Sequence, residues 1–211
     1  MKTKLHFNTL LVLFFLLLGL GASGQTTLYS EDFTGQTGKG IDGTTPNMAG
    51  ITKWSYDVTN SVTMNPGDFF KVTTFSGSER FSSFNTDALE VSPVYWISET
   101  INTVGYANLT ASVVLSRNSA NSLSGVRADY SIDNGGSWVS FGSLINSTAA
   151  NGTVGSVTPT GSQTATTATV TGLPGGGTII IRVAHWGGSS TPTYYHDDVL
   201  VTGSASCTNP V

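Results

Sequence analysis

The chain has 211 residues, of which 10% are charged and 25 are glycine, and its formal net charge is −4 at pH 7. This acidic balance argues against a nucleic-acid backbone as a partner, because no basic patch is present to displace counterions. Few charged residues together with many glycine, serine and threonine residues are typical of an extracellular all-β protein with short turns.

The segment 1–24 has the features of a secretory signal peptide. Lys2 and Lys4 precede an apolar block from Leu10 to Leu20, and small residues then lead to Gln25. The block is shorter than a membrane span, so cleavage before Gln25 is favoured over an uncleaved anchor. We therefore expect a secreted or cell-surface protein with no membrane span after cleavage.

Short stretches that alternate between apolar and polar residues predict half-buried antiparallel strands along the rest of the chain. In chain order these predicted strands are 27–33, 69–75, 80–84, 107–115, 126–132, 165–173, 178–186 and 194–201. In the fourth strand the predicted core face is Leu109, Ala111, Val113 and Leu115. In the fifth it is Val126, Ala128, Tyr130 and Ile132, while Arg127, Asp129 and Ser131 are expected to face water.

The strand spacing predicts an all-β fold, a two-sheet antiparallel β-sandwich of the jelly-roll type, over residues 25–203. No stretch shows a helical period with caps, and residues 35–50 are a predicted long polar loop. Residues 204–211 have the composition of a linker, so we expect a further domain after this chain. Cys207 is the only cysteine. An internal disulfide is excluded, and Cys207 is either paired further along or a free thiol.

The stretch "SIDNGGSW", Ser131 to Trp138, fits the Asp-box pattern Ser-x-Asp-x-Gly-x-x-Trp of sialidases. Its physical content is a hairpin, in which Asp133 and Asn134 bond the turn backbone and Gly135 and Gly136 supply positive φ angles. Trp138 is expected to pack under this turn. The motif occurs once, whereas a propeller would repeat it, so a structural hairpin is predicted and sialidase activity is not implied.

Catalytic motifs are missing from the sequence: it has no His-Glu-x-x-His, no Gly-x-Ser-x-Gly and no paired-carboxylate run of jelly-roll glycosidases. His185 is interpreted as a packed or rim histidine at the end of the strand 178–186. Most aromatic residues are expected in the core. Trp186, at a strand end beside a loop, and Tyr194 are the candidate ligand-binding residues.

The strings "DALEVSPVYWISETINTVGYANLTASVVLS", "VRADYSIDNGGSW", "TIIIRVAHW" and "YYHDDVLV" together resemble a β-sandwich module common in secreted bacterial multidomain proteins. The chain ends are similar to those of galactose-binding-like carbohydrate-binding modules and MAM domains. That resemblance implies a structural calcium held by an acidic residue of the first strand and an Asp of the closing strand. Carried over, the calcium ligands are Glu31 and Asp197, with Asp32 or loop carbonyls completing the shell.

Alternation in the closing strand places Asp197 on the face of Val199 and Val201, directed to the core. Asp198 and His196 are then expected to face outward. His196 departs from the resembled families, which have an apolar residue there. Zinc is not expected, because it prefers histidine or cysteine ligands and only His196 is nearby.

The sequence thus predicts a non-catalytic, secreted binding or adhesion module with a structural calcium and with a glycan or cell-surface polymer as its candidate partner. Two alternatives stay open. The chain could be the accessory domain of a secreted hydrolase whose catalytic part lies elsewhere, or the sandwich could itself be a glycosidase.

Overall fold

A computed structural model describes residues 24–59, 64–84, 93–117, 125–145, 156–157, 165–186 and 194–206. These residues contain strands and turns but no helix, and accordingly no helix of the described part is long and apolar enough to cross a membrane. The predicted signal peptide and Cys207 lie outside the described residues. The strands are β1 (Gln25–Glu31), β2 (Gly40–Asp42), β3 (Thr45–Asn47), β4 (Trp54–Asp57), β5 (Phe69–Phe75), β6 (Ser78–Phe84), β7 (Val94–Ser98), β8 (Ile101–Asn102), β9 (Tyr106–Arg117), β10 (Gly125–Ser131), β11 (Val139–Ile145), β12 (Ser156–Val157), β13 (Thr166–Leu173), β14 (Thr178–Trp186) and β15 (Tyr194–Ala205).

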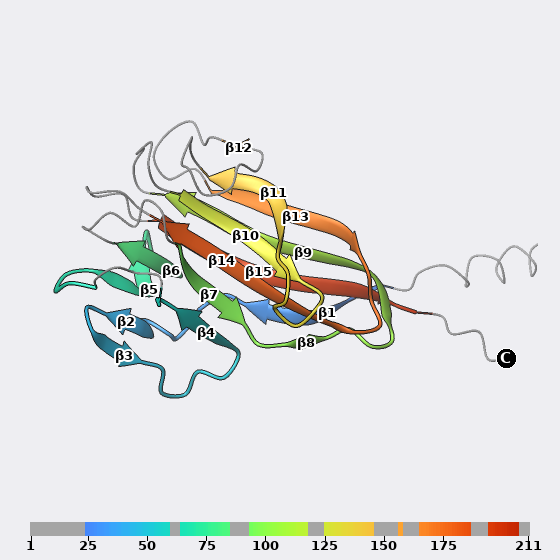
Figure 1. Ribbon diagram of the computed structural model, residues 1–211, viewed down its shortest axis with the longest axis horizontal. Helices are drawn as coiled ribbons and strands as arrows, with labels where there is room; N and C mark the ends of the chain where they lie inside the picture. The colour runs from blue at the N-terminus through green and yellow to red at the C-terminus, as the bar shows by residue number, and fades with distance from the viewer. Residues whose placement is uncertain are drawn as a thin grey trace, which may run out of the picture.

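The strands form two sheets that pack face to face, as the sequence predicts for a β-sandwich (Figure 1). The first sheet has the order β13-β9-β15-β6-β5-β2-β3, with β1 also paired to β15. The second sheet has the order β12-β11-β10-β14-β7-β4, with β8 also paired to β14. The pairs are antiparallel except β11 with β12. The all-β, two-sheet sandwich prediction is confirmed.

The core lies between the sheets and follows the predicted alternation. Leu109, Ala111, Val113 and Leu115 of β9 are fully buried, as are Val126 and Ala128 of β10. Ile132 is 50% exposed, because β10 ends at Ser131 and the hairpin turn begins there. An aromatic group fills the middle of the core, and its members are Phe33, Trp54, Phe70, Phe81 and Trp96.

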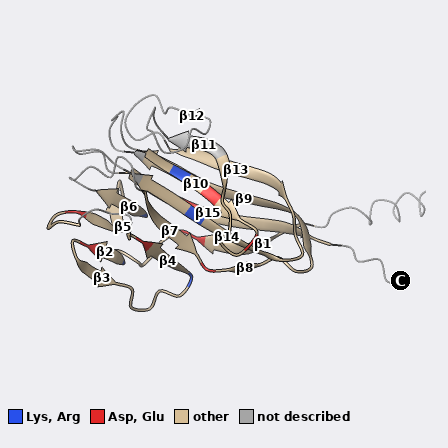
Figure 2. Cartoon of the chain, viewed as in Figure 1, with Lys and Arg blue, Asp and Glu red and all other residues tan. Residues whose placement is uncertain are grey.

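Asp129 and Ser131 were expected to face water, and this expectation is wrong in one respect. Both lie on the outer face of the second sheet, yet each is only 1% exposed. Asp129 is covered because Arg127 and Arg182 bond to its carboxylate. In Figure 2 charged positions of both signs accordingly lie close together on β10 and β14.

The predicted polar loop 35–50 contains the short hairpin β2–β3, which extends the first sheet from β5. Gly40 makes this close approach possible: its φ is 124°, and a Cβ there would overlap the backbone of Phe70 and Lys71. The sequence pattern of alternating apolar residues is too short in β2 and β3 to reveal them.

Candidate functional site

The closing strand β15 changes its partner in the middle of its length. Tyr194–His196 pair with β6, whereas Val199–Ser204 pair with β1 on the same edge. Between these two segments the register with β9 shifts between Asp197 and Leu200, and Asp198 has a positive φ of 47°. This is a β-bulge, which adds one residue and turns the following side chains over.

The bulge corrects the predicted faces of β15. His196 is fully buried rather than outward, while Val199 and Val201 are also buried. Asp197, which follows His196, was expected to face the core. Its carboxylate instead lies 3.5 Å from Arg80 Nε. Simple alternation fails here because Asp198 is the extra, outward residue of the bulge.

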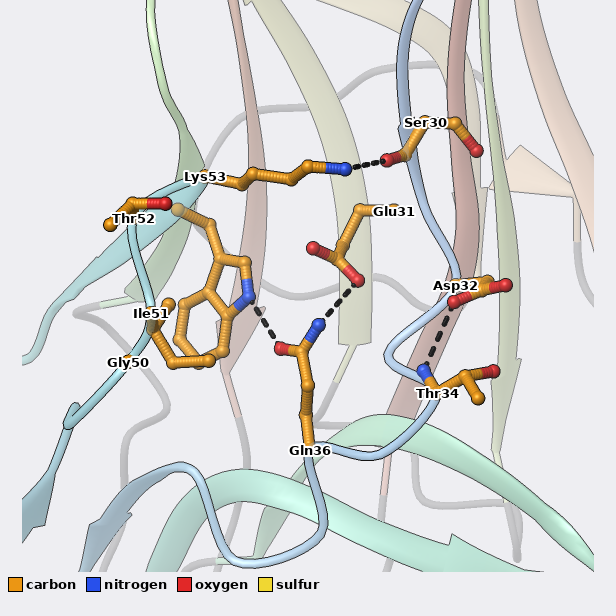
Figure 3. A pocket seen from close by; sticks show the side chains of 10 residues that line it. Ser30, Glu31, Asp32, Thr34, Gln36, Gly50, Ile51, Thr52 and Lys53 are labelled. Carbon is orange, nitrogen blue, oxygen red and sulfur yellow. Dashed lines mark hydrogen bonds between the residues drawn. The ribbon is translucent and has the colours of Figure 1, made fainter.

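A polar pocket opens where β1 ends, beside the start of β4 (Figure 3). Its volume is about 450 Å³, within the range usual for small-molecule sites. The lining residues are Ser30, Glu31, Asp32, Thr34, Gln36, Gly50, Ile51, Thr52, Lys53 and Trp54. We call this the β1 pocket.

Glu31 is the buried carboxylate of the β1 pocket, with only 4% of its surface exposed. Its Oε1 accepts hydrogen bonds of 2.8 Å from the Phe33 amide and from Gln36 Nε2. Gln36 Oε1 in turn accepts a 2.8 Å bond from Trp54 Nε1, so a chain of three side chains fixes the carboxylate. Burial raises the pKa of Glu31 above its ordinary value, and the Phe33 bond and the charge of Lys53 partly offset this.

A second pocket of about 440 Å³ lies over the bulge of β15 and is lined mainly by acidic residues. Its lining residues are Asp32, Thr34, Gly77, Ser78, Glu79, Asp197 and Asp198. Burial, followed by the charge of Asp198, raises the pKa of Asp197 to about 6, although the Asp198 amide and Arg80 act in the opposite direction. Glu79 bonds the Gly35 amide and the Thr37 hydroxyl, and these bonds lower its pKa.

The three predicted calcium ligands are not brought to one place. Glu31 lines the β1 pocket, Asp197 lines the acidic pocket, and Asp32 lines both. Among the described residues, no three His, Cys, Asp or Glu side chains form a group that could hold a metal ion. Calcium therefore stays a prediction that the resemblance implies.

The two candidate ligand-binding residues have different outcomes. Tyr194 is 1% exposed and belongs to the core, so its ring offers no surface to a ligand. Trp186 ends β14, paired to Gly125, and its side chain lies outside what the structure describes. The Trp186 platform therefore stays a prediction, and the assignment of Tyr194 is corrected.

Sequence reasoning missed a buried polar chain between the sheets. Ser83 Oγ lies 2.8 Å from His185 Nδ1, and His185 Nε2 lies 2.8 Å from His196 Nδ1. Burial lowers the pKa of His185 to about 3, and burial followed by the charge of His185 lowers that of His196 well below its ordinary value. Both rings therefore favour the neutral form at pH 7, and their hydrogen bonds join the two sheets.

The Asp-box hairpin is confirmed as a structural unit. Asp133 Oδ1 accepts bonds of 2.7 Å from Ser131 Oγ and 2.8 Å from the Ser137 amide, and its pKa falls to about 2 through bonds to Ser137 and Ser131. Positive φ angles occur at Asn134 and Gly135, rather than at Gly135 and Gly136. Trp138 lies beside the turn at Gly135, as expected, and its ring also lies against Arg182.

No protein-family model matches the chain, and no curated protein matches it. Among solved structures, it is similar to the K3 cleaved adhesin domain of Lys-gingipain from Porphyromonas gingivalis, at 16% identity and a TM-score of 0.46, over 85% of this chain and 99% of that one. It is also similar to the xylan-binding domain CBM22-1 of Paenibacillus barcinonensis Xyn10C, at 10% identity and a TM-score of 0.45, over 89% and 100%.

A third similar structure is the module TmCBM61 in complex with β-1,4-galactotriose, at 11% identity and a TM-score of 0.46, over 72% of this chain and 88% of that one. Carbohydrate-binding modules, which the sequence resembles, are thus among these structures. Likeness at this level assigns no function to this chain.

Proposed function

We propose that the chain is a secreted, non-catalytic module that binds a glycan in the β1 pocket. The observation that carries the proposal is the fixed carboxylate of Glu31. Both hydrogen bonds to this carboxylate end on Oε1, so among the described residues Oε2 has no hydrogen-bond partner. A buried acceptor that is already oriented binds a sugar hydroxyl at low entropic cost.

The rest of the pocket suits a polyhydroxylated ligand. Ser30 and Thr52 provide hydroxyl groups, and Lys53 provides an ammonium that already bonds the Ser30 carbonyl across 3.3 Å. Trp54 is 3% exposed, so it offers an edge rather than a stacking face. Recognition is therefore expected to depend on hydrogen bonds, with a smaller apolar contribution than in a stacking platform.

The test is binding to a panel of neutral oligosaccharides, followed by calorimetry on the best ligand. Glu31→Gln is expected to weaken binding about tenfold, since bonds to a charged acceptor contribute on the order of 1.5–3 kcal/mol. Glu99→Gln is the matched control, because the same change is made on an exposed residue outside the pocket. No glycan binding by the wild-type chain, or equal losses in both variants, would contradict the proposal.

Trp186→Ala tests whether the predicted platform also contributes. If the platform exists, Trp186→Ala is expected to bind the glycan more weakly than the wild type although Glu31 is unchanged. Equal affinity of the two chains would show that Trp186 is not part of the site.

The non-catalytic part of the proposal has its own test. Incubation with polysaccharide, ester and peptide substrates is expected to give no turnover above buffer. Reproducible hydrolysis that one carboxylate substitution abolishes would replace the binding module with an enzyme.

Calcium is included only as the prediction of the resemblance. Melting in EDTA tests it, with a lowered Tm expected if an ion stabilises the fold. An unmoved Tm would agree with the separated positions of Glu31 and Asp197.

A further inference from the structure

A basic and aromatic cluster lies on the outer face of the second sheet, apart from both pockets. Arg182, in the middle of β14, has its Cζ 4.4 Å from the ring centre of Tyr95 and 4.1 Å from that of Trp138. Tyr95 belongs to β7 on one side of β14, and Trp138 precedes β11 on the other side. The guanidinium therefore contacts aromatic rings from both neighbouring parts of the sheet.

The charges of this cluster do not cancel. Asp129 accepts bonds of 2.7 and 3.0 Å from Arg127 and a bond of 2.9 Å from Arg182 Nε. Among the described residues, two guanidinium groups thus share one carboxylate, so these three side chains carry one more positive than negative charge. In a chain whose net charge is −4, this face attracts an anion.

Part of Arg182 is free to receive that anion. Among the described residues, its hydrogen bonding is confined to Nε, so both Nη nitrogens have no protein partner. Asp129 and the two rings already hold the plane of the guanidinium. A planar fork fixed in this way binds a carboxylate through two parallel hydrogen bonds with little loss of side-chain entropy.

The rings define what carries the carboxylate. Tyr95 and Trp138 are half-buried, so each keeps an exposed apolar surface beside the fork. Such rings pack against the C–H faces of a sugar, whereas a free inorganic anion would gain nothing from them. We propose that Arg182, Tyr95 and Trp138 form a second binding site, for a saccharide that bears a carboxylate, such as a uronic acid.

The alternative is that the cluster only fastens the Asp-box hairpin to the sheet. A binding site and a purely structural cluster can be distinguished by ligand binding to the wild-type chain alone. Calorimetric titration with oligogalacturonate is compared with its methyl ester and with a neutral galactan oligosaccharide of equal length. If the site exists, the acid is expected to bind at least about tenfold more tightly than the ester, because the ester cannot form the charge-assisted bidentate contact with Arg182.

Variants then locate the site. Arg182→Lys keeps the charge but removes the fork, and Arg182→Met removes both; each is expected to lose about tenfold or more in affinity for oligogalacturonate. Lys71→Met is the matched control, since Lys71 also has a carboxylate partner, Asp42, and lies 5.1 Å from the Phe69 ring centre, but in the first sheet.

Unchanged affinity in Lys71→Met supports the assignment. Equal binding of acid and ester, no binding of either, or an equal loss in Lys71→Met overturns it. Binding that survives in Arg182→Lys at wild-type strength also overturns it, because a diffuse positive charge would then suffice.

Discussion

Lowering the pH from 7 to 4 is expected to destabilise the fold through the buried histidines. His185 has a folded pKa of about 3 against an ordinary value of 6.5, so below pH 6.5 the unfolded chain binds a proton that the folded chain refuses. Stability present above pH 6.5 is therefore lost as the pH falls toward 3. At pH 4, roughly 2.5 pH units below the unfolded pKa, the loss from His185 is about 3 kcal/mol. His196 acts in the same direction.

Asp197 partly offsets this loss of stability, and a variant that lacks the offset can be compared with the wild type. The folded pKa of Asp197, about 6, exceeds the ordinary 3.8, so the folded chain binds its proton first as the pH falls, which offsets about 1–2 kcal/mol at pH 4 once solvent screening of this partly exposed group is included. Asp197→Asn removes this offset. Urea denaturation at pH 7 and pH 4 is expected to show a loss about 1–2 kcal/mol larger in Asp197→Asn than in the wild type.

The reference is the double variant His185→Met with His196→Phe, which keeps an apolar core but no imidazole. It is expected to lose the histidine part of the pH dependence. The reasoning is refuted if this double variant loses as much stability between pH 7 and pH 4 as the wild type, or if Asp197→Asn and the wild type respond equally.

Three further predictions concern stability, measured by urea denaturation at pH 7. Gln36→Ala removes the acceptor of Trp54 Nε1 and one of the two donors to Glu31, and it is expected to cost about 1–3 kcal/mol. Gln25→Ala, which breaks an exposed bond to Thr202, should cost less than about 1 kcal/mol. Asp129→Ala removes the buried carboxylate that Arg127 and Arg182 both bond and is expected to cost about 3–5 kcal/mol. Asp42→Ala breaks a surface pair with Lys71 that contributes at most about 1 kcal/mol. Gly40→Ala forces a Cβ into the β5 backbone at positive φ and is expected to cost more than about 1 kcal/mol, while Gly177→Ala meets open space and should be nearly neutral. In each pair, equal costs would contradict the structural reason given.

The sandwich could be predicted from the sequence because its long strands bury one face. Leu109, Ala111, Val113 and Leu115 alternate without interruption, and the strand there extends as predicted. The hairpin β2–β3 could not be predicted, because each strand has three residues and its partner β5 is distant in the sequence. Alternation specifies a face only where enough residues repeat it.

The candidate site was predicted less completely. Glu31 and Asp32 were predicted as calcium ligands at the end of the first strand; both line the β1 pocket, and their metal role stays a prediction. The bulge at Asp198 could not be recognised, because an outward Asp is compatible with a regular strand and with a bulged one. The predicted facing of His196 and Asp197 was therefore the opposite of the observed one. Arg182 was missed because its neighbours Tyr95 and Trp138 are far from it in sequence, and only the strand order joins them.

The exchange of partners along β15 has a consequence for the order in which the protein folds. β1 pairs with β15 in a register that places Gln25 opposite Ser204. The first described strand therefore cannot form its ladder of hydrogen bonds until the last strand is present. β9 and β6 also pair with β15. Contacts between such distant segments are slow to form, and a nascent chain shorter than β15 exposes three unpaired strand edges. The first sheet is therefore expected to close only after synthesis has passed Ser204, and until then these edges are the surfaces through which the chain would aggregate.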